Sequence, residues 1–313
     1  MLTEVTFAKA KHGRESLIAY KNDKNQRVFI DVKHTDFAPG IHSVIVVDSR
    51  YDIDLVIKNA YQYQIEDKKR MEIGIKKKHI WKPLLQENIE KELEIDVYEL
   101  CRAKRNLSIL IQKLQDVLMY IEPSENGLKA YSHKLRELLI LACTDLECAF
   151  KDYKFGKNER LSDYKQILKL VDLSKYKIAL ASYSVKYESC PFKNWKTSKL
   201  DWYDAYNKTK HNRNDAFNLA TLENCLNAVC ANIIMFCVRY SPYLLYNEND
   251  VCTNLVRNTF DVRIEDEADF YIPVFEGTQT CSGAFYRSVN FPNGQVLEDI
   301  FDKKAQLPFI EGR

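Results

Sequence analysis

Residues 97–121 read VYELCRAKRNLSILIQKLQDVLMYI, and this stretch decides the fold that the sequence predicts. Its apolar residues recur at intervals of three and four, which places them on one face of an α-helix. Residues 128–150 repeat the pattern with many leucines, and the stretches 162–170, 202–212 and 216–240 also have helical patterns. We therefore predict a mainly α fold, a bundle of about five helices.

The pattern changes at both ends of this helical region. Val28–Val32 and Ser43–Asp48 are short β-branched runs that predict strands, whereas residues 53–61 fit either a short helix or a strand. Toward the C-terminus, residues 269–275 again resemble a strand. We predict a β-rich N-terminal domain over residues 1–84, a helical bundle over 85–245, and a small β or α/β extension over 246–309.

The last four residues, 310–313, read IEGR, a processing-protease site that is often placed beside a purification tag. They are therefore left out of the functional argument.

Composition narrows the class of protein without giving a function. The 313 residues include 46 Lys and Arg against 44 Asp and Glu, a balance that argues against a tail-driven polyanion binder. The first residues lack the apolar segment of a signal peptide, and the longest apolar run, Cys225–Val238, is too short and polar to span a membrane. We expect a cytosolic protein with reduced, buried cysteines and no membrane contact.

No familiar catalytic or cofactor signature is present. We find no phosphate-binding glycine loop, dinucleotide fingerprint, zinc-protease motif or nucleophile elbow. The His and Cys residues lack the spacing of metal ligands. The sequence therefore predicts neither a metal site nor a cofactor.

Polar side chains form a stripe along the otherwise leucine-rich helix of residues 131–147. Each residue of an α-helix is rotated by about 100° from the one before it. The polar side chains therefore fall within a sector of roughly 100° around the helix axis. A helix so rich in leucine is heavily buried, so its polar stripe must face solvent or a cleft shared with another helix. The residues of the stripe are His133, Arg136, Glu137, Thr144 and Glu147.

A second polar stripe lies in residues 202–215, which read WYDAYNKTKHNRND. On a helix, Arg213 would point away from this stripe unless the helix breaks near Asn212. The residues that share the face are Tyr203, Asn207, Lys210, His211 and Asn214.

Together the two stripes hold the groups that act on phosphodiesters. Histidine takes or gives a proton near pH 7, Arg and Lys hold a phosphate, and Asn orients a histidine or a ribose hydroxyl. This set suffices for metal-independent RNA cleavage, in which the 2′-hydroxyl attacks the neighbouring phosphate. The same set also suffices merely to bind a nucleotide or a phosphate.

The motifs HKLRELLILACTDLE (133–147) and WYDAYNKTKHNR (202–213) resemble a family of uncharacterised bacterial helical proteins that is similar to the HEPN superfamily. The resemblance covers about residues 95–245. It implies a helical bundle that is usually a homodimer. Many such domains are metal-independent endoribonucleases of toxin–antitoxin, abortive-infection and CRISPR systems, and others are inactive scaffolds or nucleotide binders.

The resemblance also implies roles for particular residues. His211 would be the acid/base, Lys210 and Arg213 would hold the phosphate, and Asn207 would orient a reacting group. On the facing helix, His133, Arg136 and Glu147 would complete the cleft. The usual motif of the family has an Arg four to six residues before its His, whereas here Asn207 precedes His211 and Arg213 follows it.

Three functional hypotheses follow. The first is a HEPN-like protein of phage defence or stress response that cleaves RNA and leaves a 2′,3′-cyclic phosphate. The second is a non-catalytic module that senses a nucleotide or a protein, with a partner surface on the N-terminal domain. The third is a structural subunit of a defence assembly. Purely structural interpretations stay open as well, with Arg136 ion-paired to Glu137 or Glu147, and Trp202, Tyr203 and Tyr206 packed in a core.

Overall fold

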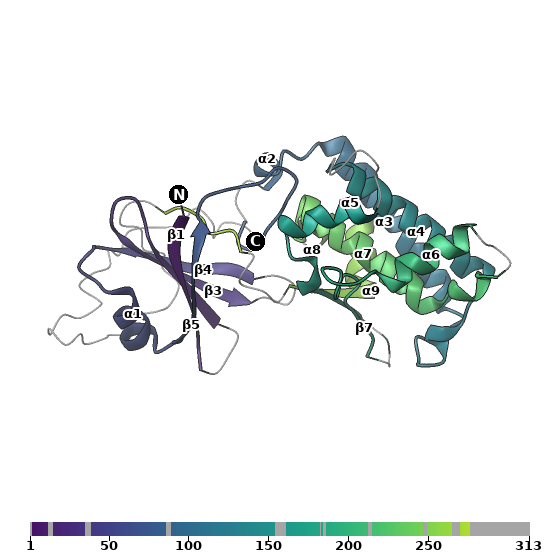
Figure 1. Ribbon diagram of the computed structural model, residues 1–313, viewed down its shortest axis with the longest axis horizontal. Helices are drawn as coiled ribbons and strands as arrows, with labels where there is room; N and C mark the ends of the chain where they lie inside the picture. Colours follow the sequence, from purple (N-terminus) through teal and green to yellow (C-terminus); the bar gives the residue numbers. More distant parts are fainter. Residues whose placement is uncertain are drawn as a thin grey trace.

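The N-terminal part of the chain forms a five-stranded antiparallel sheet in the computed structural model (Figure 1). The structure describes residues 2–11, 15–34, 39–85, 89–153, 161–181, 183, 186–211, 215–246, 249–264 and 270–275. The sheet has the order β4-β3-β2-β1-β5, so the first four strands form a meander and β5 returns beside β1. The strands are β1 (Leu2–Lys9), β2 (Glu15–Lys21), β3 (Arg27–His34), β4 (Pro39–Val47) and β5 (Gln64–Glu72).

Apolar side chains lie on both faces of this sheet because β2 and β3 are buried on both sides. Along β3, Val28 and Ile30 belong to one hydrophobic cluster, whereas Phe29 between them belongs to the other. Helix α1 (Ile53–Val56) and the π-helical turn Ile57–Tyr61 cover the Phe29 face. Residues 53–61 are thus helical, the first of the two alternatives that the sequence left open.

The opposite face is covered by residues 270–275, which we call the C-terminal strap. Phe270, Ile272 and Phe275 pack into the cluster of Val28 and Ile30. The strap is also tied by hydrogen bonds, since the Gly74 N–H donates to the Ile272 carbonyl at 2.7 Å. The prediction of a strand at residues 269–275 was wrong for the described residues 270–275, which have no strand pairing and bind the sheet largely through side chains and isolated hydrogen bonds.

Tyr20 on β2 is the polar anchor of the strap. Its hydroxyl donates to the Pro273 carbonyl at 2.8 Å and accepts from the Phe275 N–H at 3.1 Å. Replacing Tyr20 with phenylalanine leaves that N–H and carbonyl unpaired. We expect a loss of about 1–3 kcal/mol in unfolding free energy, measured by urea denaturation. Tyr98→Phe, on a side chain that is 82% exposed, is the control, and an equal loss in both variants would contradict this role.

Asp31 on β3 is a buried carboxyl group that forms no ion pair with the residues that the structure describes. It points to the Phe29 face at a β-bulge between β3 and β4, and only 3% of the residue is exposed. Its Oδ1 and the nearby Tyr61 hydroxyl are buried with no hydrogen-bond partner among the described residues. Burial, with a smaller effect of Glu15, raises the pKa of Asp31 to about 7.

The second half of the molecule is built from helices around α7 (Leu222–Tyr240) (Figure 1). Helix α7 has the length and mean hydropathy of a membrane-crossing helix, but 78% of its most apolar window is buried inside the structure. The other helices are α2 (Ile89–Glu92), α3 (Val97–Leu118), α4 (His133–Lys151), α5 (Leu161–Tyr164), α6 (Asp201–His211), α8 (Tyr243–Tyr246) and α9 (Val251–Thr259).

A second antiparallel sheet lies against these helices. It has the order β7-β6-β8 and consists of β6 (Tyr176–Leu180), β7 (Glu188–Ser189) and β8 (Phe260–Ile264). Ile178 of β6 pairs with Val262 of β8, and both side chains are fully buried.

The prediction of a mainly α helical bundle was therefore wrong. About 47% of the described residues are helical and 23% are in strands or bridges, and the strands form two antiparallel sheets. The physical reason is that β6 and β8, which pair across a long sequence separation, are only five residues long each. Their alternating patterns are too short to stand out beside the long helical patterns.

The two halves interlock through residues 80–85. Trp81 is fully buried in the helical core, where its backbone N–H donates to the Val238 carbonyl of α7 at 2.6 Å. Leu84, three residues later, belongs to the core of the five-stranded sheet. The Pro83 carbonyl accepts from the N–H of Tyr271 in the strap at 2.9 Å. This short segment thus joins both cores and the strap.

Candidate functional site

Helices α4 and α6 lie side by side and run in opposite directions. Near the start of α4, the Arg136 guanidinium donates to the Thr209 carbonyl in the last turn of α6 at 3.3 Å. Near the end of α4, Glu147 accepts a hydrogen bond of 2.6 Å from the Tyr203 hydroxyl in the first turn of α6. The two motifs singled out in the sequence therefore meet along one seam.

Local sequence explains how each helix is placed. Ser132 caps α4 by accepting from the Leu135 N–H at 3.2 Å, and the leucines that follow are buried against α7 and α3. Helix α6 has Asp201 in its first turn and Lys210 and His211 in its last. This charge distribution complements the helix dipole. Trp202 and Tyr206 are buried, in agreement with the core interpretation of these aromatic residues.

Several predicted site residues are already engaged by the chain itself. Burial, reinforced by the hydrogen bond to Glu147, raises the pKa of Tyr203 well above its usual range. Lys210 is exposed, and its Nζ donates to the Tyr206 hydroxyl at 2.9 Å, an interaction that raises the pKa of Lys210. Glu137 pairs with Lys113 on α3 at 2.6 Å, so it points away from the α4–α6 seam. Glu147 thus joins α4 to α6, whereas the bond of Lys210 lies within α6.

Histidine side chains remain accessible at the far end of the seam. His211 is exposed at the end of α6, and Asn207 one turn earlier is half-buried. Within the described part of the chain, neither side chain has a hydrogen-bond or ion-pair partner. His133 is exposed in the first turn of α4, and its ring centroid lies 4.6 Å from that of Phe217. Arg213, predicted to hold a phosphate, lies outside the described residues.

Aromatic rings that the sequence prediction did not include surround His133. Tyr131 is 52% exposed and contacts Phe217 edge to face, with the ring centroids 5.7 Å apart. Tyr120, just past the end of α3, is 78% exposed, and the Lys134 ammonium lies 5.8 Å from its ring centroid. We call this surface the α4 tip, and define it as Tyr120, Tyr131, His133, Lys134 and Phe217.

The α4 tip lies at the same end of the seam as the last turn of α6. The Arg136–Thr209 hydrogen bond joins these two turns, and residues 217–222 run back along the start of α4, where Leu222 N–H donates to the Ala130 carbonyl at 2.9 Å. In the sequence, only the position of Tyr131 directly before the Ser132 cap could have indicated the α4 tip. Residues at helix ends are often exposed.

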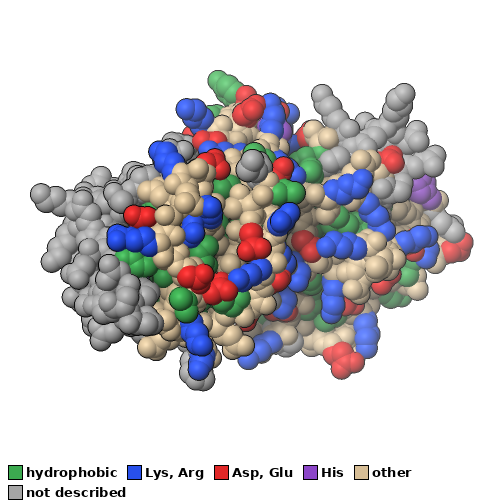
Figure 2. Space-filling view, turned by 60° about the vertical axis from the view of Figure 1, so that its left-hand side comes forward, with side chains coloured by type: hydrophobic (Ala, Val, Ile, Leu, Met, Phe, Trp, Pro, Cys, Tyr) green, Lys and Arg blue, Asp and Glu red, His purple; other side chains and the backbone are tan. Residues whose placement is uncertain are grey.

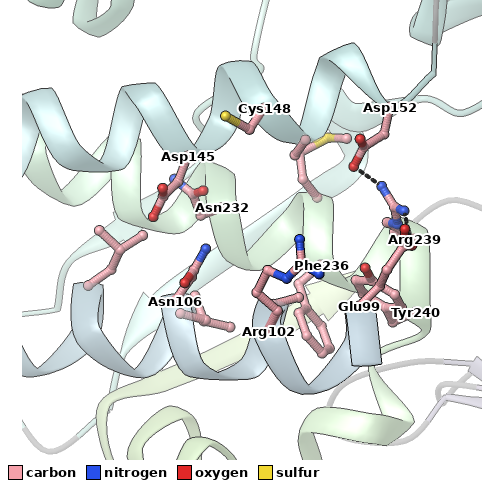
Figure 3. A pocket seen from close by; sticks show the side chains of 15 residues that line it. Glu99, Arg102, Asn106, Asp145, Cys148, Asp152, Asn232, Phe236, Arg239 and Tyr240 are labelled. Atoms are coloured by element: carbon pink, nitrogen blue, oxygen red, sulfur yellow. Dashed lines mark hydrogen bonds and ion pairs between the residues drawn. The ribbon is translucent and has the colours of Figure 1, made fainter. Parts of the chain in front are cut away.

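A separate pocket of about 250 Å³ opens between α3, α4 and α7 (Figure 3). Arg239 of α7 closes one end, where its guanidinium donates to Glu99 at 2.7 Å and also pairs with Asp152. None of the predicted site residues lines this pocket, which the sequence analysis did not anticipate. Its other polar lining residues are Arg102, Asn106, Asp145, Cys148 and Asn232.

The cysteines follow the prediction only in part. The eight in the described part of the chain are free, and Cys143, Cys225, Cys230 and Cys237 are buried as predicted. Cys148 is exposed at the pocket instead, because it lies on the face of α4 that α3 and α7 leave open. Among the described residues, no group of three or more His, Cys, Asp and Glu side chains is placed to hold a metal ion.

Charged side chains of both signs lie on the face shown in Figure 2, where Asp and Glu are interspersed among Lys and Arg. Comparisons with known proteins add no family: no protein-family model, no curated protein and no solved structure matches this chain.

Proposed function

We propose that the α4 tip binds single-stranded RNA, as a HEPN-like protein of phage defence or stress response would. The observation that supports this proposal is the combination of exposed rings, Tyr120 and Tyr131, with the cationic side chain of Lys134. Base stacking on an aromatic side chain contributes about 1–3 kcal/mol per base, and cations hold the phosphates between bases. Tyrosines at such exposed positions contribute little to the protein core.

We further propose that His211 is the acid/base of RNA cleavage at this surface. In that reaction His211 accepts the proton of a ribose 2′-hydroxyl while the 2′-oxygen attacks the adjacent phosphorus. The bond from phosphorus to the 5′-oxygen breaks, and the leaving oxygen takes up a proton, which leaves a 2′,3′-cyclic phosphate. Lys210 and His133 are the cationic or proton-donating groups proposed to assist, and a homodimer is the proposed assembly.

Binding without cleavage is the second candidate function. It is favoured by the internal bonds of Arg136 to Thr209 and of Glu147 to Tyr203, which leave these two predicted site residues less available to a substrate. In that case the same surface would sense RNA or a nucleotide, with the N-terminal sheet available to a protein partner.

RNA binding is tested with the double variant Tyr120→Ala/Tyr131→Ala. We expect its affinity for a labelled single-stranded RNA, measured by fluorescence anisotropy, to fall at least about tenfold, because two stacking rings are lost. Tyr98→Ala is the matched control, since Tyr98 is 82% exposed at the opposite end of α3. Equal affinity for all three proteins would contradict the proposed surface.

Cleavage is tested by incubating wild type and His211→Ala with the same RNA in the presence of EDTA. Wild type is expected to release products with a 2′,3′-cyclic phosphate, and the variant to lose at least about a hundredfold in rate. Both proteins should bind the RNA with similar affinity, so that loss of rate is separated from loss of binding. If wild type binds RNA and leaves it intact, the catalytic role of His211 is rejected and the binding function remains.

A further inference from the structure

The described residues that line the pocket between α3, α4 and α7 include one carboxylate more than they include cationic groups. At one end, Arg239 pairs with Glu99 and Asp152, so these three groups largely satisfy one another. Asp145 and Arg102 also line the pocket, and neither has an ion-pair partner within the described part of the chain. Three carboxylates against two guanidinium groups leave one negative charge in excess, which a bound monocation would neutralise.

Asp145 on α4 is the carboxylate that remains without a counter-charge. The residue is half-buried, and its carboxylate makes no hydrogen bond or ion pair with the residues that the structure describes. Burial raises the pKa of this carboxyl, because the hydration that it loses is not replaced by a neighbouring group. A cation bound beside Asp145 would favour the ionised carboxylate and offset the cost of its burial.

Amide side chains from the other two helices lie close to Asp145. Asn232 on α7 lies next to it, and Asn106 on α3 lies opposite both (Figure 3). The Asn232 amide nitrogen donates to the Ala142 carbonyl at 2.8 Å and to the Ala228 carbonyl at 2.9 Å, so its Oδ1 remains as an acceptor. Asn106 has no hydrogen-bond partner among the described residues, and its Oδ1 is an acceptor as well. Each of the three helices thus supplies an oxygen acceptor at this end of the pocket.

The next helical turn of the pocket, toward Arg239, is lined by apolar side chains. They are Ala103, Ala149 and Phe236, each about one turn, or about 5 Å, from the acceptor on its own helix. Arg102 lies at the same level on α3, and its guanidinium extends into the space between the helices (Figure 3). A ligand that begins at the acceptors therefore has room for a short apolar part, and a second cationic group on it would face Arg102.

We propose that this pocket binds a small monoamine, a primary ammonium ion with a short apolar body. A primary ammonium group has three N–H donors, which match the oxygen acceptors of Asn106, Asp145 and Asn232. Its positive charge neutralises Asp145, and its apolar body packs against Phe236. The ligand needs no contact with Arg239. The volume of about 250 Å³ lies just below the usual range for drug-sized ligands, about 300–1,000 Å³, which favours a molecule of this size.

This site goes beyond RNA binding and does not depend on it. Asp145 projects from α4 into the pocket, whereas Arg136 and Glu147 contact α6 on another side of the same helix. Failure of either proposal therefore leaves the other in place.

The ligand class is tested by thermal unfolding of the full chain at pH 7.5 with butylamine, hexylamine and 2-phenylethylamine, all of which are protonated at that pH. At a concentration tenfold above its dissociation constant, at least one of these amines is expected to raise Tm by about 3 °C. The alcohol with the same carbon skeleton tests the charge, and the N,N,N-trimethyl derivative tests the N–H donors. Neither compound should raise Tm at the same concentration.

Matched variants locate the binding. Asp145→Asn and Asn106→Ala are expected to weaken the binding of the amine, measured by calorimetry, by at least about tenfold. Asp116→Asn and Asn254→Ala make the same changes at exposed helical positions outside the pocket and should bind like wild type. Arg102→Gln should bind the amine at least as tightly as wild type does, because it removes a like charge from the pocket.

Folding of the pocket variants is not expected to suffer, because neither Asp145 nor Asn106 has a partner among the described residues. Their Tm without ligand should be no lower than that of wild type. The proposal is overturned if no amine raises Tm, or if the alcohol or the trimethylated compound raises Tm as much as the amine. It is also overturned if the pocket variants bind as tightly as their controls, or if Arg102→Gln binds as weakly as Asp145→Asn.

Discussion

Replacing Asp31 with asparagine is expected to stabilise the protein at pH 8 by up to about 4 kcal/mol. The carboxyl is buried in the five-stranded sheet and has a pKa of about 7, against an ordinary value of 3.8. A difference of about three units corresponds to about 4 kcal/mol, since each unit is about 1.4 kcal/mol. Asparagine keeps the shape of the side chain and has no charge to desolvate. The gain is an upper value, because the amide nitrogen also requires a partner.

The raised pKa of Asp31 makes the stability of the folded protein depend on pH. Below about pH 4, Asp31 is protonated in both the folded and the unfolded chain and contributes nothing. Between about pH 4 and pH 7, the unfolded chain has lost the proton and the folded chain retains it, so the stability contributed by this group falls as the pH rises. Above about pH 7, the full cost of the buried charge is present.

The measurement is the free energy of unfolding from urea denaturation, taken at intervals from pH 4 to pH 8. The difference between Asp31→Asn and wild type should increase across this range in favour of the variant. Asp23→Asn, on an exposed residue after β2, is the control and should follow the wild-type curve. A constant difference between Asp31→Asn and wild type at every pH would show that the pKa of Asp31 is not raised in the folded protein.

The second large effect is expected at the Arg239 ion pairs. Removing both carboxylates with Glu99→Gln/Asp152→Asn leaves the buried guanidinium without a counter-charge, and we expect a loss of about 3 kcal/mol in unfolding free energy. Arg239→Met should cost less. It leaves two carboxylates that are 49% and 52% exposed and therefore hydrated, and its side chain fills an apolar position.

The comparison is made by urea denaturation at pH 7, with Glu125→Gln as the control. Glu125 pairs with Lys129 at 3.3 Å, but both side chains are largely exposed, so its removal should cost at most about 0.5 kcal/mol. If Arg239→Met is as destabilising as the double carboxylate variant, the packing of the long side chain, and not its charge, is the dominant contribution.

The helices that carry the candidate site could be predicted well from the sequence. Residues 97–121 were predicted to be helical, and α3 spans Val97–Leu118, because its buried leucines recur with a helical period. The helix predicted over 128–150 is α4, which begins later, at His133, where Ser132 provides the cap. Of the residues in the two predicted polar stripes, Tyr203 and Glu147 contact each other across the helices, whereas Arg136 bonds the backbone carbonyl of Thr209, which was not in a stripe.

The sequence did not predict features in which the structure or exposure of a residue depends on residues far along the chain. Residues 250–264 were not predicted as the helix α9 followed by the strand β8, because the alternating pattern of β8 extends over only five residues and its partner β6 lies far along the chain. Tyr120 and Tyr131 were not proposed as functional residues, since exposure at a helix end cannot be distinguished from burial by spacing alone.

Local periodicity and capping residues thus determined where the long helices begin and end, since those preferences act within a few turns of the chain. Only the tertiary structure decided that residues 270–275 cover the five-stranded sheet, that Asp31 is buried, and that Arg102 and Asp145 line one pocket. These features depend on contacts between segments separated by many residues, and such contacts are set by the packing of the whole molecule rather than by the order of neighbouring residues.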